Sequence, residues 1–511
     1  MGQDTEIKNI LDSVHGQIKI PKEWCDKIID TPYFQRLRRI EQNSCRAVFP
    51  SARHDRFIHS LGVYHIGTLI ASHLENQCEI PEFEYSILDT YKLACLLHDV
   101  GHTPFSHTFE VYFNEPELRK ALSAALDDEI FDSDLGARAT HLTEHELLSA
   151  YIAVSVFKGI LSNDDIINWP LLARMIIGLP YVDASDRKDA TRFENIMIEL
   201  IHGTIDADGL DYVCRDVWAG GYHNFAVDLH RLIDAIIITK QGENYRLAFS
   251  AKAINEIESV LNIKNFQFLY VFNHHKVLLE QLYLVEAMKS ASVYHMDIQD
   301  RKSALEALCN YRSYLGNIVL PKIKYNFFRP CDDDFIALMK QSVPFDDVFI
   351  RGWFERRFQH KPLWKSKIHF FHCLSDLLYD IKVPIDIQRQ NNTDAYLKKI
   401  RDTRIETICQ DSCKKEIIKT FGLEESDIFQ IAVTPKIRKI GDEIYIALGE
   451  DVRKFTELSH DSFTVTSDLN RFCYWYVNLD KIQGDDNYEI KRSKIIDEIK
   501  KVVLKLENTQ A

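Results

Sequence analysis

Long apolar runs, a surplus of positive charge and paired cysteines are the features that this 511-residue sequence lacks. No apolar run is long enough to cross a bilayer, and residues 1–10 have no apolar core of the kind that a secretory signal needs. The formal net charge is −14, which gives no support to nucleic-acid binding, because general nucleic-acid binders are basic. These absences predict a cytoplasmic protein that is not embedded in a membrane.

The 11 cysteines are scattered singly, and only Cys409 and Cys413 lie close together in the sequence. No second pair of cysteines or histidines lies near them at zinc-finger spacing. Many single thiols are typical of proteins from a reducing compartment. The cysteines therefore predict neither a disulfide framework nor a zinc finger.

The first part of the chain has the pattern of a helical protein. From Pro21 to about Leu308, apolar residues recur at helical spacing, with breaks at glycine and proline. Before this part, a glycine followed by alternating residues predicts a short hairpin arm over residues 12–20. Because 511 residues are too many for one ordinary core, we predict a first domain over residues 1–310.

The remainder, residues 311–511, mixes helical and extended patterns. Residues 437–448 predict two strands about a Gly-Asp turn, and the aromatic segment 471–478 predicts another strand. Residues 491–506 repeat apolar side chains at helical spacing. The sequence therefore predicts a mainly α fold, with a helical core followed by a smaller C-terminal α+β part.

One histidine lies on the apolar side of a predicted helix. His59 shares a helical face with Val63, Ile66 and Ile70, so its imidazole is expected to be buried. Taken alone, this pattern is more typical of a core histidine than of a metal ligand.

An adjacent His-Asp pair follows a helix that is apolar nearly all round. A carboxylate such as Asp99 is costly in so apolar a setting unless a partner compensates its charge, and a divalent metal does this well. Together, His98 and Asp99 offer one nitrogen and one oxygen ligand, a mixture that suits Mn, Fe, Zn or Co.

Two more histidines follow in the loop after this pair. Gly101 and Pro104 end the helix and keep His102 and His107 near its end. Imidazoles beside a metal bind phosphate or deliver protons, although an ordinary surface loop remains an alternative.

A fourth segment supplies acidic groups at helical spacing. Asp208, Tyr212 and Asp216 are spaced i, i+4 and i+8, so they share one helix face. Asp208 then completes a metal site, and Tyr212 and Asp216 face a ligand; the alternative is a solvated acidic helix. Together, the four segments predict metal-assisted hydrolysis of a phosphate ester.

These segments, with the flanking residues 30–40 and 48–50, resemble the HD superfamily and, within it, the deoxynucleoside triphosphate (dNTP) triphosphohydrolases. The resemblance covers roughly residues 8–300 and extends more weakly into the C-terminal part. It implies an HD-type helical core and a divalent metal (Mg, Mn, Fe, Co or Zn) held by His59, His98, Asp99 and Asp208.

The resemblance also implies a reaction, in which water attacks the α-phosphorus and the products are a deoxynucleoside and triphosphate. His107 matches the residue that protonates the leaving sugar oxygen, His102 matches one that pairs with an acidic residue, here Glu110, and His145 matches a further active-site histidine. The implied substrate contacts are Arg56 and Tyr212 to phosphate, and Gln42 and Asp216 to the sugar.

The departures from the family pattern concern the substrate. Asn43 stands where relatives carry a leucine that helps to reject a 2′-hydroxyl, which weakens the case for strict deoxy selectivity. Gly209 stands where relatives have Lys or Arg, so one phosphate-binding cation is missing. Lys276, in a His-Lys pair resembling one near the family's base pocket, is a candidate replacement, and the preferred base stays open.

Relatives are homo-oligomers that nucleotides often activate, and Asp30, Gln35 and Arg38 match a guanine-effector pocket. An alternative is a plain cationic helix face formed by Arg36, Arg38 and Arg39. The resemblance implies a role in nucleotide-pool control or phage defence. Two other functions stay open: hydrolysis of a signalling nucleotide, and a nucleotide-sensing regulator with weak catalysis.

Overall fold

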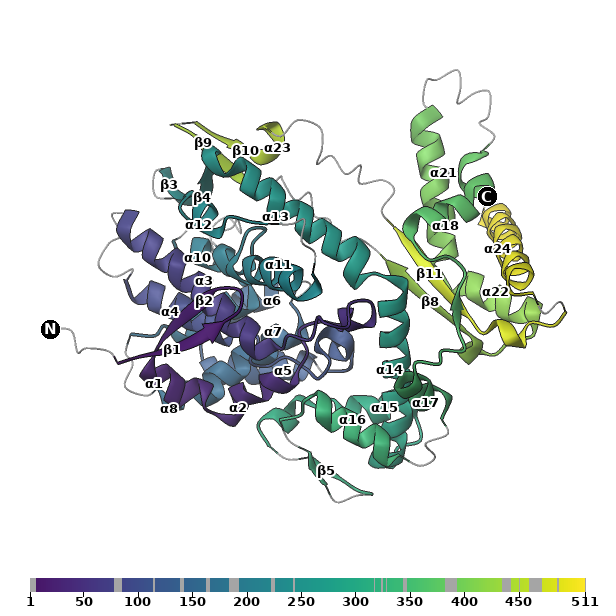
Figure 1. Cartoon of the computed structure of the whole chain (residues 1–511), viewed down its shortest axis with the longest axis horizontal. Helices are drawn as coiled ribbons and strands as arrows, with labels where there is room; N and C mark the ends of the chain where they lie inside the picture. Colours follow the sequence, from purple (N-terminus) through teal and green to yellow (C-terminus); the bar gives the residue numbers. More distant parts are fainter. Residues whose placement is uncertain are drawn as a thin grey trace. The chain divides into compact units, whose positions relative to one another are not determined.

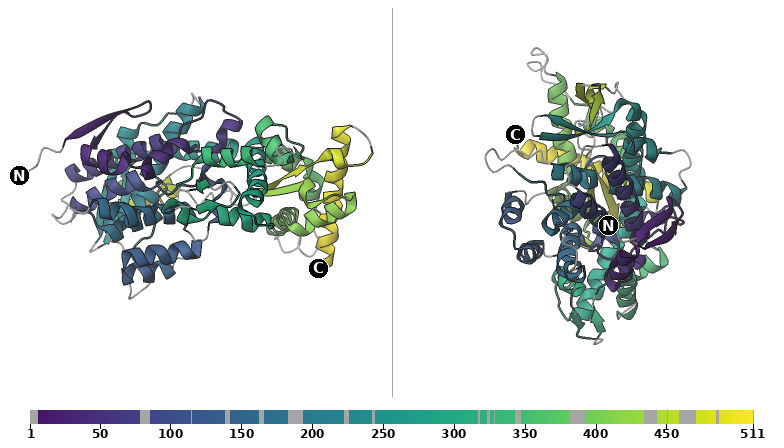
Figure 2. Two further views of the ribbon diagram at one scale, coloured as in Figure 1. Left: turned by 90° about the horizontal axis from the view of Figure 1, so that it is seen from below. Right: turned by 90° about the vertical axis from the view of Figure 1, so that its left-hand side faces the viewer.

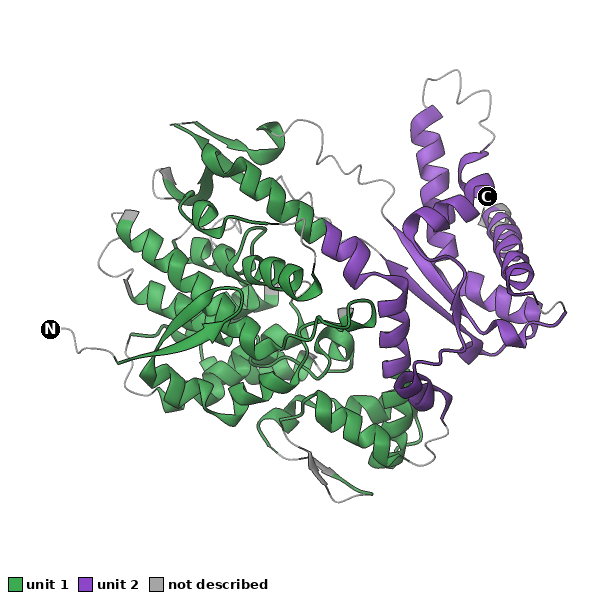
Figure 3. Cartoon of the chain, viewed as in Figure 1, with its two compact units in different colours: residues 1–265, 285–345, 439–460 green, residues 266–284, 346–438, 461–511 purple. Residues whose placement is uncertain are grey.

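The computed structural model of the chain describes residues 6–77, 85–113, 115–137, 142–161, 166–182, 193–221, 226–241, 244–316, 318–322, 325–327, 329–342, 347–381, 393–433, 443–449, 451–458, 471–484 and 487–510. Contacts divide the chain into two compact units (Figure 3). Unit 1 comprises residues 1–265, 285–345 and 439–460, and unit 2 comprises residues 266–284, 346–438 and 461–511. Each unit therefore consists of three separate segments of the chain, whereas the sequence predicted a single boundary at residue 310.

The fold is mainly helical, as predicted, and unit 1 holds most of the helices (Figure 1). Its elements before residue 240 are β1 (Ile7–Asp12), β2 (Gly16–Pro21), α1 (Lys22–Trp24), α2 (Pro32–Gln35), α3 (Arg56–Gln77), α4 (Tyr85–Leu97), α5 (Glu115–Leu126), α6 (Glu129–Ala137), α7 (Glu144–Ile152), α8 (Lys158–Ile160), α9 (Trp169–Ile177), α10 (Phe193–His202), α11 (Ala207–Gly220), α12 (Leu229–Ile233) and β3 (Ile236–Gln241). The later ones are β4 (Asn244–Ser250), α13 (Ile254–Phe266), most of α14 (His275–Met296), α15 (Arg301–Leu308), β5 (Ile318–Leu320), β6 (Tyr325–Phe327), α16 (Asp332–Gln341), β9 (Tyr445–Leu448), β10 (Asp451–Lys454) and α23 (Phe455–Leu458).

Unit 2 is the α+β part. After the start of α14 it contains α17 (Val348–Glu355), β7 (Lys361–Pro362), α18 (Lys367–Cys373), α19 (Ser375–Tyr379), α21 (Thr393–Ile408), α22 (Asp411–Phe421), β8 (Ile428–Val433), β11 (Phe472–Val477) and α24 (Tyr488–Gln510). Its strands form one sheet in the order β7-β11-β8, with both pairings antiparallel. The strand predicted over residues 471–478 and the helix predicted over 491–506 are therefore confirmed as β11 and α24.

The predicted N-terminal hairpin is also confirmed. β1 and β2 pair antiparallel, and Gly16 takes a positive φ of 74° at the turn. The hairpin lies along the helices of unit 1 in both Figure 1 and Figure 2, and Ile18 and Ile20 on β2 are fully buried.

A second sheet in unit 1 has the order β10-β9-β4-β3. β9 is the second of the two strands predicted over residues 437–448, and the first falls outside the described residues. None of the helices in the described part of the chain has the length and apolar character that crossing a bilayer requires.

The helices that matter for the site are α3, α4 and α11, and close approaches between them depend on glycine. A Cβ on Gly67 of α3 would lie 2.6 Å from the Cys95 sulfur of α4, and a Cβ on Gly62 would lie 1.9 Å from Asp211 Oδ1 of α11. Glycine at these two positions therefore lets α3 pack closely against both helices. As predicted, α4 is largely buried: Leu93 to Leu97 are fully inaccessible to solvent, whereas Asp89 is partly exposed.

Candidate active site

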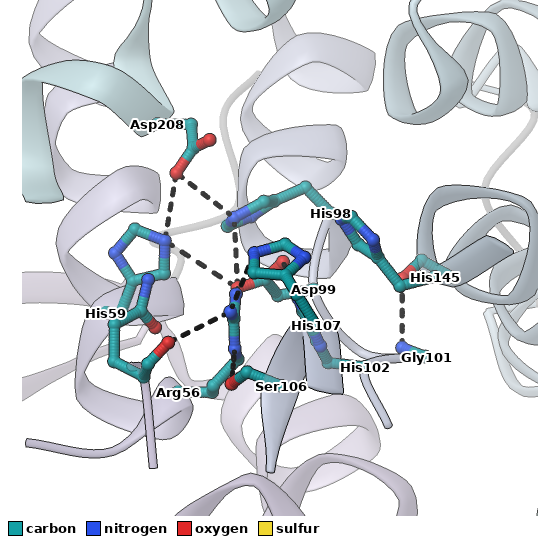
Figure 4. A network of polar contacts seen from close by, with 12 residues as sticks. Arg56, His59, His98, Asp99, Gly101, His102, Ser106, His107, His145 and Asp208 are labelled. Carbon is teal, nitrogen blue, oxygen red and sulfur yellow. Dashed lines mark hydrogen bonds and ion pairs between the residues drawn. The ribbon is translucent and has the colours of Figure 1, made fainter. Parts of the chain in front are cut away.

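Helices α3, α4 and α11 bring four predicted metal ligands together (Figure 4). His59 Nε2 lies 2.9 Å from Asp208 Oδ1 and 3.6 Å from Asp99 Oδ2, and His98 Nε2 lies 3.8 Å from Asp208 Oδ1 and 3.5 Å from Asp99 Oδ2. The candidate ligand atoms of His59, His98 and Asp208 all lie within 4.8 Å of one another. Both histidines are buried, whereas the Asp208 side chain is 39% exposed, so the cluster has one side open to solvent.

The hydrogen bonds of the two imidazoles suit a divalent metal. The Nδ1 atom of His98 bonds the Cys95 carbonyl at 2.9 Å, which turns Nε2 toward the cluster. This buried Nε2 has no hydrogen-bond partner among the described residues, a costly arrangement that a metal would relieve. Two imidazole nitrogens with carboxylate oxygens form a ligand set that suits Zn, Fe, Mn or Co.

Arg56 links the four candidate metal ligands to the surrounding loops through hydrogen bonds. It donates to Asp99 Oδ2 at 2.6 Å, to Ser106 Oγ at 2.9 Å and to the Gln42 carbonyl at 3.1 Å. Burial alone would raise the pKa of Asp99, but Arg56 and the neighbouring histidines hold it well below its usual range. The predicted phosphate contact is thus engaged within the protein: Arg56 is 3% exposed and all its nitrogens bond to protein groups.

A buried network of ion pairs contacts the Nδ1 side of His59, opposite the nitrogen that faces the other candidate ligands. Asp211 Oδ2 bonds His59 Nδ1 at 2.7 Å, and Arg215 donates to both carboxylate oxygens of Asp211 at 2.8 Å. The hairpin turn joins the network, since Arg215 also donates to Asp12 at 2.9 Å and His15 Nε2 lies 2.5 Å from Asp211 Oδ1. Partners of this kind fix the orientation of a metal-binding imidazole and raise its basicity.

We expect the isosteric change Asp211→Asn to lower metal affinity by about 10- to 100-fold, because it removes the charge that orients His59. Metal retained per chain after equilibration with a graded series of chelator measures this effect. Asp497→Asn on the exposed side of α24 is the matched control. Unchanged metal retention in a folded Asp211→Asn protein would show that the network serves stability alone.

Three histidines and one carboxylate form a second cluster beside the first. His145 Nδ1 and His107 Nδ1 lie 2.7 and 2.9 Å from Glu110 Oε1, and the His102 ring stacks on His145 with centroids 4.2 Å apart. The predicted pairing of His102 with Glu110 is thus the weakest of the three, because His102 Nε2 lies 3.9 Å away. Gly101 permits the stacking, since its Cβ would lie 2.3 Å from the backbone nitrogen of Ser149 on α7.

The charges in this second cluster alternate. Burial opposes ionisation of Glu110, but His145 and His107 hold its pKa well below the usual range. Burial also disfavours a charged His145, yet Glu110 raises its pKa to about 9. Burial and the nearby Arg56 lower the pKa of His102 well below its ordinary value. At neutral pH Glu110 is therefore a carboxylate, His145 is an imidazolium and His102 is a neutral imidazole.

The loop that carries these histidines is held in a strained conformation. Phe105 and Ser106 both have a φ of +55°, which is costly for residues with a side chain. Asp332 of α16 compensates by accepting from the Phe105 N–H at 2.6 Å and the Glu41 N–H at 3.0 Å. Ser106 Oγ donates to the Glu41 carbonyl at 2.5 Å, so the loop is fixed to the segment before Gln42.

The predicted sugar contacts lie near one another. Asn43 Nδ2 donates to Asp216 Oδ1 at 3.0 Å, and His54 Nε2 lies 2.6 Å from the same oxygen. Gln42 is 8% exposed, and its Oε1 accepts no hydrogen bond from any described residue.

The other predicted contacts have mixed outcomes. Lys276 begins α14 in unit 2, unlike the remaining predicted site residues, which lie in unit 1. Gln35 Oε1 accepts from Arg38 Nε at 3.0 Å, whereas Asp30 pairs with Lys8 at 3.5 Å; the effector site stays a prediction. The alternative of a cationic helix face is wrong for Arg36, which is buried and donates to the His102 carbonyl.

Part of the chain matches a known family of domains. Residues 56–180, from α3 to just beyond α9, match the family model of the HD domain. The chain contains an HD domain. Such a domain indicates a metal-dependent phosphohydrolase, in agreement with the two clusters, whose residues all lie in the matched range except Asp208.

Relatives of the HD domain protein occur in archaea, bacteria and vertebrates. An uncharacterised protein of Methanocaldococcus jannaschii is 27% identical over 298 residues, 58% of this chain and 52% of that protein. The deoxynucleoside triphosphate triphosphohydrolase SAMHD1 of Gallus gallus is 28% identical over 330 residues, 60% of this chain and 50% of that protein. The uncharacterised protein YwfO of Bacillus subtilis is 30% identical over 249 residues, 47% of this chain and 48% of that protein. The chain thus spans about half the length of these relatives, of which one is named a deoxynucleoside triphosphate triphosphohydrolase.

Two solved structures share the fold along nearly the whole chain. A hypothetical protein of Aquifex aeolicus has a TM-score of 0.61 at 22% identity, covering 96% of this chain and all of that one. A phosphohydrolase of Bacteroides thetaiotaomicron has a TM-score of 0.58 at 19% identity, covering 94% and 100%. The fold therefore extends beyond the HD domain itself.

Sequence reasoning missed several residues around the HD domain site. His54 binds Asp216, Asp211 orients His59, and Lys264 of α13 approaches the segment around Asp208. His54 and Asp211 lie beside predicted residues in the sequence, which is a weak signal. Lys264 gave no sequence signal at all.

Proposed function

We propose that this chain hydrolyses deoxynucleoside triphosphates to a deoxynucleoside and inorganic triphosphate. The observation that carries the proposal is the meeting of two clusters: a ligand set for a divalent metal, and an imidazole-carboxylate cluster next to it. A metal site alone fits many hydrolases, but a neighbouring set of proton donors suits cleavage of an unactivated phosphate ester. The vertebrate relatives named as dNTP triphosphohydrolases support the same substrate class.

In this proposal, His59, His98, Asp99 and Asp208 hold the metal, which when bound supplies a Lewis acid that activates water and withdraws charge from phosphate. His107 is the proton donor. Glu110 fixes its Nδ1 at 2.9 Å, and its side chain is 63% exposed, so Nε2 can face a ligand.

The proposed reaction is a balanced hydrolysis. Water adds to the α-phosphorus and releases one proton to solvent, the bond from that phosphorus to the 5′-oxygen breaks, and His107 Nε2 gives its proton to the departing oxygen. Glu110 and the charged His145 keep the His107 ring in one orientation and return a proton from solvent to it afterwards.

The sugar would lie near Gln42, Asn43 and Asp216. The buried acceptor Gln42 Oε1 suits a sugar hydroxyl, which would supply the hydrogen bond that the oxygen lacks. Asn43 carries a polar amide at the position beside it, which suits a second hydroxyl as well.

We expect Asn43→Leu to lower the ratio of ribonucleotide to deoxynucleotide hydrolysis by about 10-fold or more, since an apolar side chain leaves a 2′-hydroxyl without a partner. Competition between each NTP and its dNTP, with products separated by chromatography, measures this ratio. An exchange that leaves the ratio flat would mean that selectivity resides in another residue.

The decisive experiment is a substrate panel. Purified protein is incubated with Mg, Mn or Co and with each dNTP and NTP, singly and in mixtures. Deoxynucleoside plus triphosphate as products supports the proposal, and activity seen only in mixtures supports a nucleotide effector. Diphosphate or monophosphate products, or no hydrolysis of any nucleotide in the panel, would overturn it.

A further inference from the structure

Gly209 follows the candidate metal ligand Asp208 directly, and its missing side chain has an identifiable cause. An ideal Cβ at this position would lie 2.3 Å from both Lys264 Nζ and Asp206 Oδ1, and 2.8 Å from Lys264 Cε. The backbone does not require glycine here, because Gly209 lies inside α11 and has no positive φ. The end of the Lys264 side chain and the N-cap carboxylate of Asp206 thus share the space in which a side chain at 209 would begin.

Lys264 reaches this place from the last turns of α13. Its Nζ donates to the Thr204 carbonyl at 2.8 Å and lies 5.4 Å from the centre of the Tyr212 ring. Asp208 and Tyr212 lie one helical turn apart on the same face of α11. The ammonium therefore lies beside the helix face that carries both a candidate metal ligand and a predicted phosphate contact.

A purely structural role would be to neutralise Asp206, the N-cap residue of α11. The distance from Lys264 Nζ to Asp206 Oδ1 is 3.5 Å, and Asp206 already accepts the Gly209 N–H at 2.7 Å. The closest partner of the ammonium among the described residues is thus a neutral carbonyl, not this carboxylate. The ammonium also bonds the neutral Tyr212 side chain, and a phosphate oxygen in its place would make a stronger, charge-assisted hydrogen bond.

The charge of the site makes a second cation necessary. A nucleoside triphosphate brings three to four negative charges to a chain whose formal net charge is −14. Arg56, the predicted phosphate contact, is occupied by Asp99 and is 3% exposed. Lys264 keeps 18% of its side chain exposed. Burial would lower the pKa of Lys264, but Asp206, Tyr212 and Asp208 raise it above the ordinary value, so the amine is protonated at neutral pH.

We propose that Lys264 binds the phosphate chain of the substrate beside Asp208, and that glycine is needed at position 209 to admit it. The inference rests on the proposed function, because it names the cation that receives a triphosphate. It also makes Lys264 a specificity-determining residue: the ammonium favours ligands with a long phosphate chain over nucleosides and monophosphates.

Binding of inorganic triphosphate, measured by calorimetry on the metal-loaded protein, tests this inference without catalysis. We expect Lys264→Ala to weaken binding by roughly 10- to 100-fold, the value of a lost charge-assisted contact, with metal content unchanged. Lys252→Ala, at an exposed lysine just before α13, is the matched control and should bind as the wild type does.

A swap of the two positions sharpens the test. Gly209→Lys alone should bind poorly, because its side chain would collide with Lys264 and Asp206, whereas Gly209→Lys combined with Lys264→Ala removes the first collision and should regain part of the affinity. A merely structural lysine would change the unfolding temperature of the free protein and leave the affinity for triphosphate as it was.

The outcomes separate the two proposals. Wild-type affinity in a folded, metal-loaded Lys264→Ala protein would overturn the role of Lys264 even if the protein hydrolyses dNTPs. A wild-type protein that binds no triphosphate and hydrolyses no nucleotide would overturn the proposed function and this inference together.

Discussion

The double variant His98→Ala, Asp99→Ala is expected to purify without bound divalent metal and to lose all measurable phosphohydrolase activity. It removes one nitrogen and one oxygen ligand. Loss of a residue that only bonds to a ligand lowers metal affinity by about 10- to 100-fold, so loss of two ligands should lower it further. Metal content by elemental analysis, together with turnover in the presence of added Mn, measures both effects.

This double variant also leaves Arg56 without its carboxylate partner in a buried place. Loss of structure is therefore checked by thermal unfolding, and the milder variant His98→Gln keeps Asp99 and the Arg56 pair intact. A buried histidine far from the clusters in the chain, His295, which bonds the Leu338 carbonyl at 2.9 Å, gives the matched control His295→Gln. Full metal content in a folded His98→Gln, Asp99→Asn protein would refute the assignment of these ligands.

The second large effect concerns His107. We expect His107→Gln to lower turnover by about 100- to 10,000-fold, the usual contribution of a positioned proton donor, while metal content stays at the wild-type level. The expectation follows from Glu110, which holds His107 Nδ1 at 2.9 Å and leaves the other nitrogen for the leaving oxygen. Single-turnover kinetics with a dNTP separates this chemical step from product release.

A substrate with a better leaving group distinguishes a proton donor from a residue that only binds. An aryl phosphate ester needs little protonation of its leaving oxygen, so His107→Gln should slow its hydrolysis far less than that of a dNTP. The exposed His230 on α12 provides the control His230→Gln. Equal losses on both substrates would assign His107 to binding, and unchanged turnover would remove it from the reaction.

Much of the fold could be predicted because its signals are local. The hairpin of β1 and β2, the buried helix α4, strand β11 and helix α24 each carry their pattern within a few consecutive turns or strands of sequence. The interleaved division into two units could not be predicted in this way. It depends on contacts between segments distant in the chain, such as the parallel pairing of β4 with β9.

The candidate site, too, could be predicted only in part. His98 and Asp99 could be singled out because costly polar groups after an apolar helix need a partner, and the resemblance to the HD superfamily added His59 and Asp208. The structure places the four side chains within a few ångströms of one another. Their spacing gave no information on the partners behind them. Asp211 reaches His59 only because Gly62 lets two helices approach closely.

The sequence by itself thus determined the helical character of the core and the kinds of candidate ligand, histidine and aspartate, since these follow from residue type and local periodicity. Only the tertiary structure decided which groups meet. In the structure, Glu110 lies closer to His107 and His145 than to His102, and Arg36 is buried. Lys264 of α13 lies beside Gly209. The physical reason is that the pairing of charges depends on distances of a few ångströms between separate helices, and packing sets those distances.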